Sequence, residues 1–283
     1  MLSVRTLLYS LYQAARNTIA HDGIEHAGYL AFLGLLALFP FLVFIVALTG
    51  FIGEGQAGSE LIRLVFSQAP PDMVKALEPR IAEIISGPPQ GLLTISILGA
   101  LWTSSSEVEG YRTVLNRAYN VTSPPSYILR RLLSIVQTLI VSFVLVVLMI
   151  ALVVIPIESE KILALFGRSF HLDAAINDQI AHISIAVIFI VVSAAYYVLP
   201  NIKQTIHAVV PGAAVVTLLW LGTARLLSLY LSQFDQVNLI YGSLGGIIAA
   251  LLFFYVSNII FIYGAELNYL LKKALGEKIE QKQ

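Results

Sequence analysis

Five long runs of the chain contain no acidic residue, lysine or arginine, and each is long enough to cross a lipid bilayer. They cover residues 27–53, 132–157, 180–202, 204–224 and 236–265. A helix needs about 20 apolar residues to cross a hydrocarbon layer ~30 Å thick. Backbone N–H and C=O groups inside lipid must be paired within the protein. The pattern therefore predicts an all-α, polytopic membrane protein.

A sixth run, residues 91–106, is only 16 residues long. The distribution of lysine and arginine supports it as a span, because cytoplasmic segments carry an excess of these residues. With six spans, segments 1–26, 107–131, 203 and 272–283 carry 2 + 4 + 1 + 4 = 11 of them, against 5 in the opposite segments. The bias predicts a membrane protein with both termini in the cytoplasm.

The expected organisation has three parts. Residues 1–26 form a cytoplasmic amphipathic helix, which lies on the inner membrane surface or packs under the bundle. Residues 27–271 form the six-span domain, and 272–283 form a cytoplasmic tail. The spans are expected at about 27–53, 91–106, 132–157, 180–199, 208–231 and 242–268. The outer segments 54–90 and 158–178 are expected to contain short amphipathic helices at 59–66, 72–86 and 161–166.

Prolines are expected at the end of one helix and at the start of another. Beyond Ser106, apolar positions keep helical spacing, so the second span should continue into the cytoplasm until Ser123-Pro124-Pro125 ends it. Pro211 is expected in the first turn of the fifth span, where its missing N–H costs nothing.

Composition narrows the functional classes. The chain has 283 residues, of which 58% are hydrophobic and 12% charged, and its formal net charge is zero. A neutral chain offers no broad basic surface for nucleic acid. Cysteine is absent from the chain, which leaves no thiol nucleophile and no Cys-based zinc site. We expect no cofactor, and lipid is the one partner that the pattern requires; oligomerisation stays open.

The sequence offers no set of residues that we would assign to catalysis, so we expect no enzyme. His21, Asp22, Glu25 and His26 could face one another at i, i+4 on a helix and hold a metal. They also form the polar turn before the first span, and we expect no metal site there.

Arg225 lies about 15 residues into the fifth span, or about 22 Å along a straight helix. A charge at that depth is costly and normally faces the bundle interior, a partner or water. One interpretation is a binding or gating residue on a transport path; the other is a long side chain that reaches the outer headgroups. Its candidate partners are Asp235, Asp178 and Glu158.

Glu266 follows the uncharged run of the sixth span, and Asn258 lies about two turns earlier. Glu266 could be an interfacial carboxylate paired with Arg112, Arg117 or Lys272. It could instead couple transport to a proton or cation at a cytoplasmic mouth. Arg225, Glu266, Asn258 and Asp235 are therefore the candidate residues of a transport path.

Polar residues also gather where the second span meets the cytoplasm. Glu109 and Arg112 have the i, i+3 spacing of an ordinary helical ion pair. Together with Glu107 and Asn116 they are candidates for a cytoplasmic gate.

Small residues recur every four positions in the sixth span, at Gly242, Gly246 and Ala250. This spacing lets two helix backbones approach closely in lipid. Tight packing is one interpretation, and a pathway lined by backbone is the other.

Several segments resemble the YihY/virulence factor BrkB family of six-span inner-membrane proteins. They occur in the family's order and cover nearly the whole chain: Tyr29-Leu-Ala-Phe32, Leu38-Phe-Pro-Phe41, Leu101-Trp-Thr103, Leu115-Asn-Arg-Ala-Tyr119, Tyr196-Tyr-Val-Leu-Pro200, Val210-Pro-Gly-Ala213, Ile240-Tyr-Gly-Ser-Leu-Gly245 and Gly264-Ala-Glu-Leu-Asn268. Many relatives carry a second Tyr and a Ser where this chain has Phe32 and Ala37. Any role that those two hydroxyl groups have in the relatives is therefore missing here.

The family once bore a ribonuclease BN-like label, but this chain lacks the metal-ligand cluster that would activate water. The resemblance implies a membrane protein that exports a small solute or lipid. The sequence therefore favours a transporter of a small polar solute or lipid. The alternative is a structural or regulatory membrane protein that binds partners through its charged cytoplasmic helix and outer segments.

Overall fold

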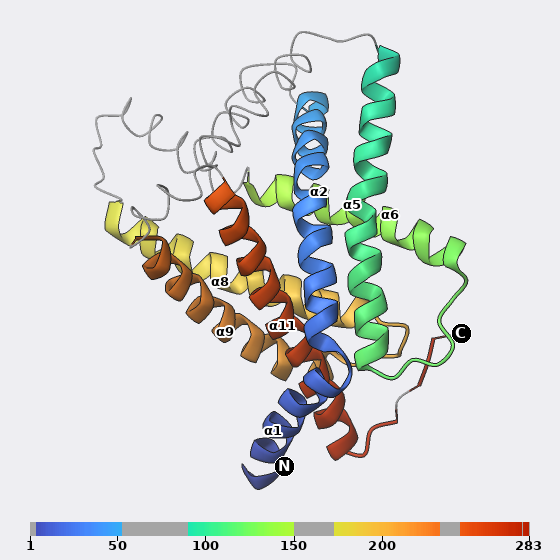
Figure 1. The fold of residues 1–283 in the computed structure, drawn as a ribbon, viewed down its shortest axis with the longest axis vertical. Helices are drawn as coiled ribbons and strands as arrows, with labels where there is room; N and C mark the ends of the chain where they lie inside the picture. The colour runs from blue at the N-terminus through green and yellow to red at the C-terminus, as the bar shows by residue number, and fades with distance from the viewer. Residues whose placement is uncertain (1–3, 53–89, 150–172, 233–243, 279, 283) are drawn as a thin grey trace. The chain divides into compact units, whose positions relative to one another are not determined.

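The computed structural model describes residues 4–52, 90–149, 173–232, 244–278 and 280–282. Within them the chain forms α-helices and one isolated β-bridge, between Ile202 and Gln281 (Figure 1). The helices are α1 (Val4–Ala20), α2 (Gly23–Ile52), α5 (Gln90–Ala118), α6 (Tyr127–Met149), α8 (Asp173–Val198), α9 (Ile206–Ser232) and α11 (Leu244–Ala274). The expected all-α class is confirmed for the described residues.

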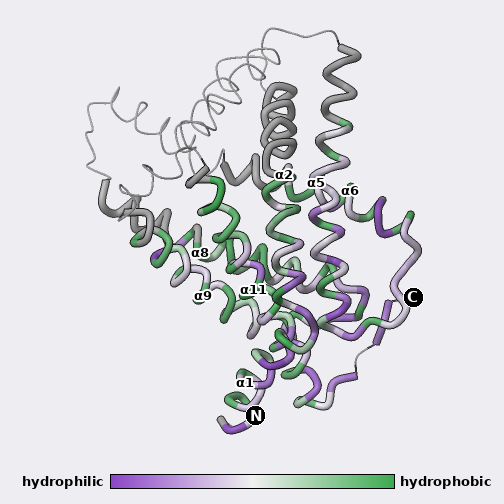
Figure 2. Tube along the Cα trace, in the orientation of Figure 1, coloured by the Kyte–Doolittle hydropathy of each residue, from purple (hydrophilic) through white to green (hydrophobic). Residues whose placement is uncertain are grey.

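Within the described residues, three stretches are long and apolar enough to cross a membrane: Tyr127–Val144, Ile206–Leu227 and Ile247–Ala274. Two shorter apolar stretches, Gly23–Ala37 and Ile185–Val198, lie in α2 and α8. Figure 2 shows the hydrophobic residues that dominate α9 and the middle of α11. These lengths account for three of the six expected spans.

Some expectations fall on residues outside the described ranges. The short helices expected at 59–66, 72–86 and 161–166 belong there, as do Asp235 and Gly242. The fourth span was expected to begin at residue 180. The helix that contains it, α8, begins earlier, at Asp173.

The chain divides into two compact units. Unit 1 combines Met1–Leu35, Glu107–Arg130 and Ile183–Gln283, and unit 2 combines Leu36–Ser106 and Arg131–His182. The residues that matter for the candidate site all belong to unit 1.

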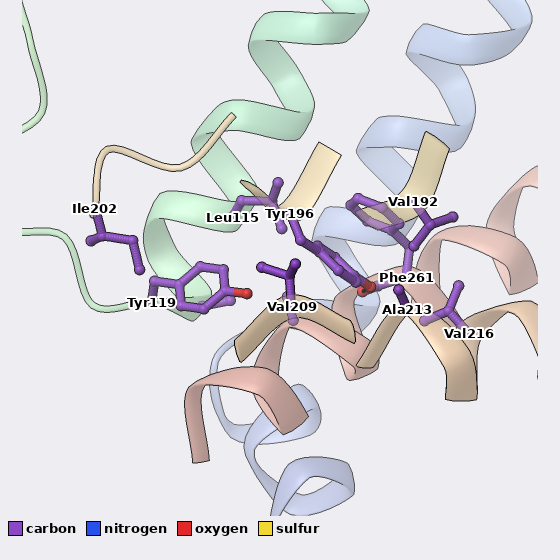
Figure 3. Packing of buried hydrophobic residues seen from close by; sticks show 11 residues of the cluster. Leu115, Tyr119, Val192, Tyr196, Ile202, Val209, Ala213, Val216 and Phe261 are labelled. Atoms are coloured by element: carbon purple, nitrogen blue, oxygen red, sulfur yellow. Dashed lines mark hydrogen bonds between the residues drawn. The ribbon is translucent and has the colours of Figure 1, made fainter. Parts of the chain in front are cut away.

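Aromatic and aliphatic side chains from four helices form the core of unit 1 (Figure 3). Leu115 of α5, Val192 and Tyr196 of α8, Val216 of α9 and Phe261 of α11 are buried together. The ring of Tyr196 stacks on that of Phe261 with centroids 4.7 Å apart, and its hydroxyl donates to the Phe261 carbonyl at 2.6 Å. Because this hydroxyl is buried, the bond removes the cost of an unpaired polar group.

Helices α9 and α11 meet at a pair of glycines. A Cβ atom at Gly212 would collide with the Gly264 carbonyl, and one at Gly264 would collide with Val216 and the Tyr196 hydroxyl. The backbones can approach this closely only because both positions lack a side chain. Of the three small residues expected to pack the sixth span, Ala250 is half-buried on α11.

The glycine contact follows a proline inside α9. This helix begins at Ile206, so the expectation that Pro211 stands in its first turn is wrong. A proline in a helix interior disturbs the backbone hydrogen bonds around it. Asn268 of α11 compensates, because its Oδ1 accepts from the Gly212 N–H at 2.7 Å and its Nδ2 donates to the Val209 carbonyl at 3.1 Å.

A residue with positive φ lies two positions after the end of three helices: Asp22 after α1, Asn120 after α5 and Gly276 after α11. After α5, the N–H of Asn120 (φ 53°) donates to the Arg117 carbonyl, and the N–H of Val121 donates to the Asn116 carbonyl. These two bonds form a Schellman motif. Gly276 (φ 71°) ends α11 in the same way. As expected, one helix runs past Ser106, but it stops at Ala118, before Ser123-Pro124-Pro125.

Helix α6 illustrates how unit 2 distributes its side chains. Ser134, Thr138 and Ser142 are buried at spacings of four, whereas large apolar residues such as Leu132 and Ile140 are exposed. This is the arrangement of a helix that faces lipid, where small and polar residues mediate helix packing.

Candidate functional site: buried polar groups of α5 and α11

Helix α11 carries four strongly polar side chains that are almost fully buried: Asn258, Glu266, Asn268 and Lys272. They lie in a stretch that is apolar enough to cross a membrane. Polar groups at such depth are costly unless they are hydrogen-bonded, and they commonly mark solute or ion paths. The partners of each side chain therefore decide what it can do.

Asn258 is joined to α5 by a short hydrogen bond. The Tyr111 hydroxyl donates to its Oδ1 at 2.7 Å. The Tyr111 ring also packs edge-on against Phe261, with centroids 5.2 Å apart. The bond fixes the amide of Asn258 toward α5.

Glu107 lies one helical turn before Tyr111 and points at α2. A Cβ atom at Gly34 would be 3.1 Å from its Oε1 and 4.0 Å from the ring of Phe254. Glu107 is half-buried, and none of the ion pairs within the described residues involves it. The result is a carboxyl group held among α2, α5 and α11, next to the Tyr111–Asn258 pair.

Glu266 faces the turn between α1 and α2. Its Oε1 lies 2.7 Å from Nδ1 of His21, and its Oε2 accepts from Asn17 Nδ2 at 3.3 Å. The expected pairing with Arg112, Arg117 or Lys272 is wrong, because those three side chains have other partners. Arg112 pairs with Glu109, Arg117 with Asp22, and Lys272 donates to the Lys203 carbonyl.

The expected ion pair between Glu109 and Arg112 is present, with Arg112 Nε 3.2 Å from Oε2. Arg130 adds a second contact to Glu109 at 3.1 Å. Arg112 also donates to the Leu199 carbonyl at 3.4 Å, and Asn116 Oδ1 accepts from the Asn201 N–H at 2.7 Å. The end of α5 is thus tied to the turn between α8 and α9.

The C-terminal tail is bound across this same turn. The Lys203 N–H donates to the Glu280 carbonyl at 2.8 Å, and the Lys282 N–H donates to the Asn201 carbonyl at 3.1 Å. The Lys282 side chain donates to the Pro200 carbonyl at 3.1 Å. Burial lowers the pKa of Lys282, and the nearby Arg112 lowers it further. Nothing in the sequence of the tail indicated this contact.

Arg225 is placed apart from the buried polar groups. It is exposed on α9 and shares the face of Leu218, Gly222 and Leu229, which are also exposed. This placement favours the interpretation of a long side chain that reaches the headgroups. Its candidate partner Asp235 lies outside the described residues.

The four residues considered for a metal are separated by the break between α1 and α2. Asp22 has φ 56° and pairs with Arg117, while Nδ1 of His26 contacts the Asp22 carbonyl oxygen at 2.6 Å. Among the described residues no group of three His, Cys, Asp or Glu side chains could hold a metal ion.

Sequence reasoning singled out Glu107, Glu266 and Asn258 but not Asn268. Of their neighbours' contacts, it predicted only the pair between Glu109 and Arg112. Tyr111 was seen only as an apolar position of a helix, and Asn17 was not singled out. Tyr111 carries a hydroxyl group at an otherwise apolar position of its helix, whereas Asn17 lies between Gln13 and His21 at helical spacing. Which neighbour each would meet depended on how α1, α5 and α11 pack.

Comparisons with known proteins agree with the geometry of a helical membrane protein. The family model described as Virulence factor BrkB matches residues 14–283. A Bacillus subtilis (strain 168) protein, YfkH, whose name describes it as ribonuclease-like, is 33% identical over 254 residues, which is 89% of this chain and 91% of that protein. A UPF0761 membrane protein of Pseudoalteromonas atlantica is 23% identical over 276 residues, which is 94% of this chain and 87% of that protein. No solved structure matches the chain.

Proposed function

The chain belongs to the family described as Virulence factor BrkB, and from that premise we propose that it is an inner-membrane transporter. It exports a small polar solute or a lipid. It has six spans, three of which are the long apolar stretches of α6, α9 and α11, and both termini lie in the cytoplasm. The positive charge of the cytoplasmic segments supports this orientation.

One observation carries the proposal. The Glu107 carboxyl group lies beside Gly34 and Phe254, one turn from Tyr111 and its partner Asn258. Ionisable groups inside a membrane domain are costly and are retained where they bind a solute or an ion. A carboxyl group that forms no ion pair with the described residues can take up a proton or cation and release it again.

The other polar residues have supporting roles in this proposal. Tyr111 and Asn258 form the neutral wall of the path beside Glu107. Glu266 holds α1 against α11 through His21 and Asn17. Glu109, Arg112 and Asn116 control the cytoplasmic mouth, because they join α5 to the turn between α8 and α9.

We further propose that the chain is not an enzyme, although one relative's name describes it as ribonuclease-like. Cleavage of a phosphodiester needs an activated nucleophile near an acid or a metal. The buried polar side chains of α11 are instead engaged in hydrogen bonds between helices. Incubation of the purified chain with labelled RNA, with and without Mg²⁺, tests this point; metal-dependent cleavage contradicts it.

The transport proposal is tested with the purified chain in liposomes. The vesicles are loaded with a soluble metabolite extract and contain phosphatidylethanolamine labelled with a fluorophore that dithionite reduces. Mass spectrometry measures efflux of each solute, and dithionite reduction measures movement of the lipid. We expect at least one of these rates to exceed that of empty liposomes, and Glu107→Gln and Asn258→Leu to remove most of the excess.

The matched control is Glu277→Gln, which neutralises an exposed carboxylate after the end of α11. We expect this variant to transport like the original chain. If the original chain moves neither a solute nor the lipid faster than empty liposomes, the proposal is wrong. The alternative of a structural or regulatory membrane protein would then stand.

A further inference from the structure

The two faces of α1 have different chemistry. One face packs on α11: Ser10, Ala14 and Thr18 are buried, and Ala14 contacts Leu267 and Leu271. The Tyr263 hydroxyl donates to the Leu11 carbonyl at 3.3 Å and fixes the helix further. Figure 1 shows α1 beside the C-terminal part of α11. The small, polar face is therefore the one turned inward.

The opposite face is apolar and exposed. The exposed fractions of Leu8, Tyr9, Tyr12 and Ile19 are 62%, 65%, 67% and 65%. At 100° per residue, Leu8, Tyr12 and Ile19 fall within a 40° sector on the side opposite Ala14. An exposed apolar face of this size marks a contact with a membrane or with another protein.

The charges on this face indicate what binds to it. Arg5 and Arg16 are exposed beside Tyr12, and residues 4–20 contain no Asp or Glu. Helices with arginine beside exposed aromatic and aliphatic residues lie in the headgroup region of a membrane. Arginines there attract anionic lipids.

We propose that α1 is an interfacial helix that binds anionic phospholipid headgroups. Leu8 and Ile19 enter the acyl boundary, Tyr9 and Tyr12 lie at the headgroup level, and Arg5 and Arg16 pair with lipid phosphates. The inward face of the helix transmits this contact to α11 through Ala14. The site does not depend on the proposed transport activity.

A second copy of the chain is the competing occupant, and the charges disfavour it. A two-fold symmetric contact brings the same residues of both copies together. Arg5 and Arg16 would then face the arginines of the other copy, with no acidic residue on α1 to neutralise them. Anionic headgroups remove this repulsion.

The chain has no cysteine, so a single introduced cysteine can be labelled cleanly. Leu8→Cys and, as a second reporter, Ile19→Cys are labelled with a fluorophore in the full-length chain in liposomes. Quenching is measured with doxyl-labelled phosphatidylglycerol, with doxyl-labelled phosphatidylcholine and with aqueous iodide. The control is Glu277→Cys, at an exposed position after the end of α11.

We expect lipid quenching at both reporters and iodide quenching at the control. Phosphatidylglycerol should quench more than phosphatidylcholine, because each arginine near the surface favours an anionic headgroup by about fivefold. The double variant Arg5→Gln/Arg16→Gln should lose this preference, and Arg5→Lys/Arg16→Lys should keep it.

Three results would overturn the proposal. Iodide quenching of both reporters would place this face of α1 in water. Lipid quenching that disappears as the ratio of protein to lipid rises would show that a second copy covers the face. Equal quenching by the two lipids in the labelled reporters that keep Arg5 and Arg16 would contradict the anionic preference.

Discussion

Helices α9 and α11 are similar in length and apolar character, yet they treat polar side chains in opposite ways. Helix α11 buries Asn258, Glu266 and Asn268 and gives each a hydrogen-bond partner on another helix or turn. Helix α9 exposes Arg225 on a face shared with Leu218 and Leu229. The depth of a charge along a span therefore does not reveal which face it occupies.

The difference has a physical basis. Short polar side chains cannot reach the headgroups from within a span, so they must pair inside the bundle. A long arginine side chain can lie along the helix and place its guanidinium in the headgroup region. The comparison predicts that substitutions at the inner face of α11 are damaging and those at the outer face of α9 are tolerated.

The largest effect is expected at the contact between the two helices. Gly264→Val would force a side chain into Val216 and the Tyr196 hydroxyl. Overpacking of this kind costs about 1–3 kcal/mol and sometimes more. We expect a clear drop in the thermal unfolding temperature of the detergent-solubilised chain, measured by size-exclusion chromatography after heating.

The same change on the outer face of α9 serves as the control. Gly222 has open space where its Cβ would lie. Gly222→Val should leave the unfolding temperature nearly unchanged. Equal losses for the two variants would show that the glycine contact is not what distinguishes them.

A smaller loss is expected for Asn268→Leu. This change leaves the Gly212 N–H and the Val209 carbonyl without the side chain that pairs them next to Pro211. A buried polar group left unpaired costs about 1–3 kcal/mol. Thermal unfolding should show this loss of stability. Stability equal to that of the original chain would mean that both backbone groups find other partners without Asn268.

Tyr111→Phe should cost less, about 1 kcal/mol, because it removes one hydrogen bond and keeps the ring packed on Phe261. Transport should be reduced as well if the pair lines the path. Unfolding temperature and solute efflux are measured on the same preparation. Loss of efflux without loss of stability would separate a functional role from a structural one.

The smallest effect is expected for Arg225→Leu. An exposed side chain away from the core usually changes stability by less than about 0.5 kcal/mol. Arg225→Leu should also leave efflux unchanged, since the structure separates it from the buried polar groups of α11. A marked loss of efflux would return Arg225 to the transport path.

Much of the fold could be predicted from the sequence, because the apolar runs are long and lipid leaves helices as their only solution. The continuation of α5 beyond Ser106 followed from helical spacing in the same way. The partners of Glu266 could not be predicted, because His21 and Asn17 are about 250 positions away in the chain. Local pattern carries no information on such pairs.

The glycine contact was missed for a related reason. Gly242, Gly246 and Ala250 have the regular spacing that indicates helix packing, but Gly212 and Gly264 lie on different helices. The contact pairs one glycine from α9 with one from α11. Their importance arises only where the two helices cross.

The central claim is that the polar face between α5 and α11 lines a path for water and solute, whereas the exposed face of α9 meets lipid. Single cysteines at Asn258 and Leu226 in the cysteine-free chain test it directly, with a charged, water-soluble thiol reagent applied to liposomes. The account predicts that the buried Asn258→Cys is modified while the exposed Leu226→Cys is not. Modification of Leu226→Cys with an inert Asn258→Cys would contradict it.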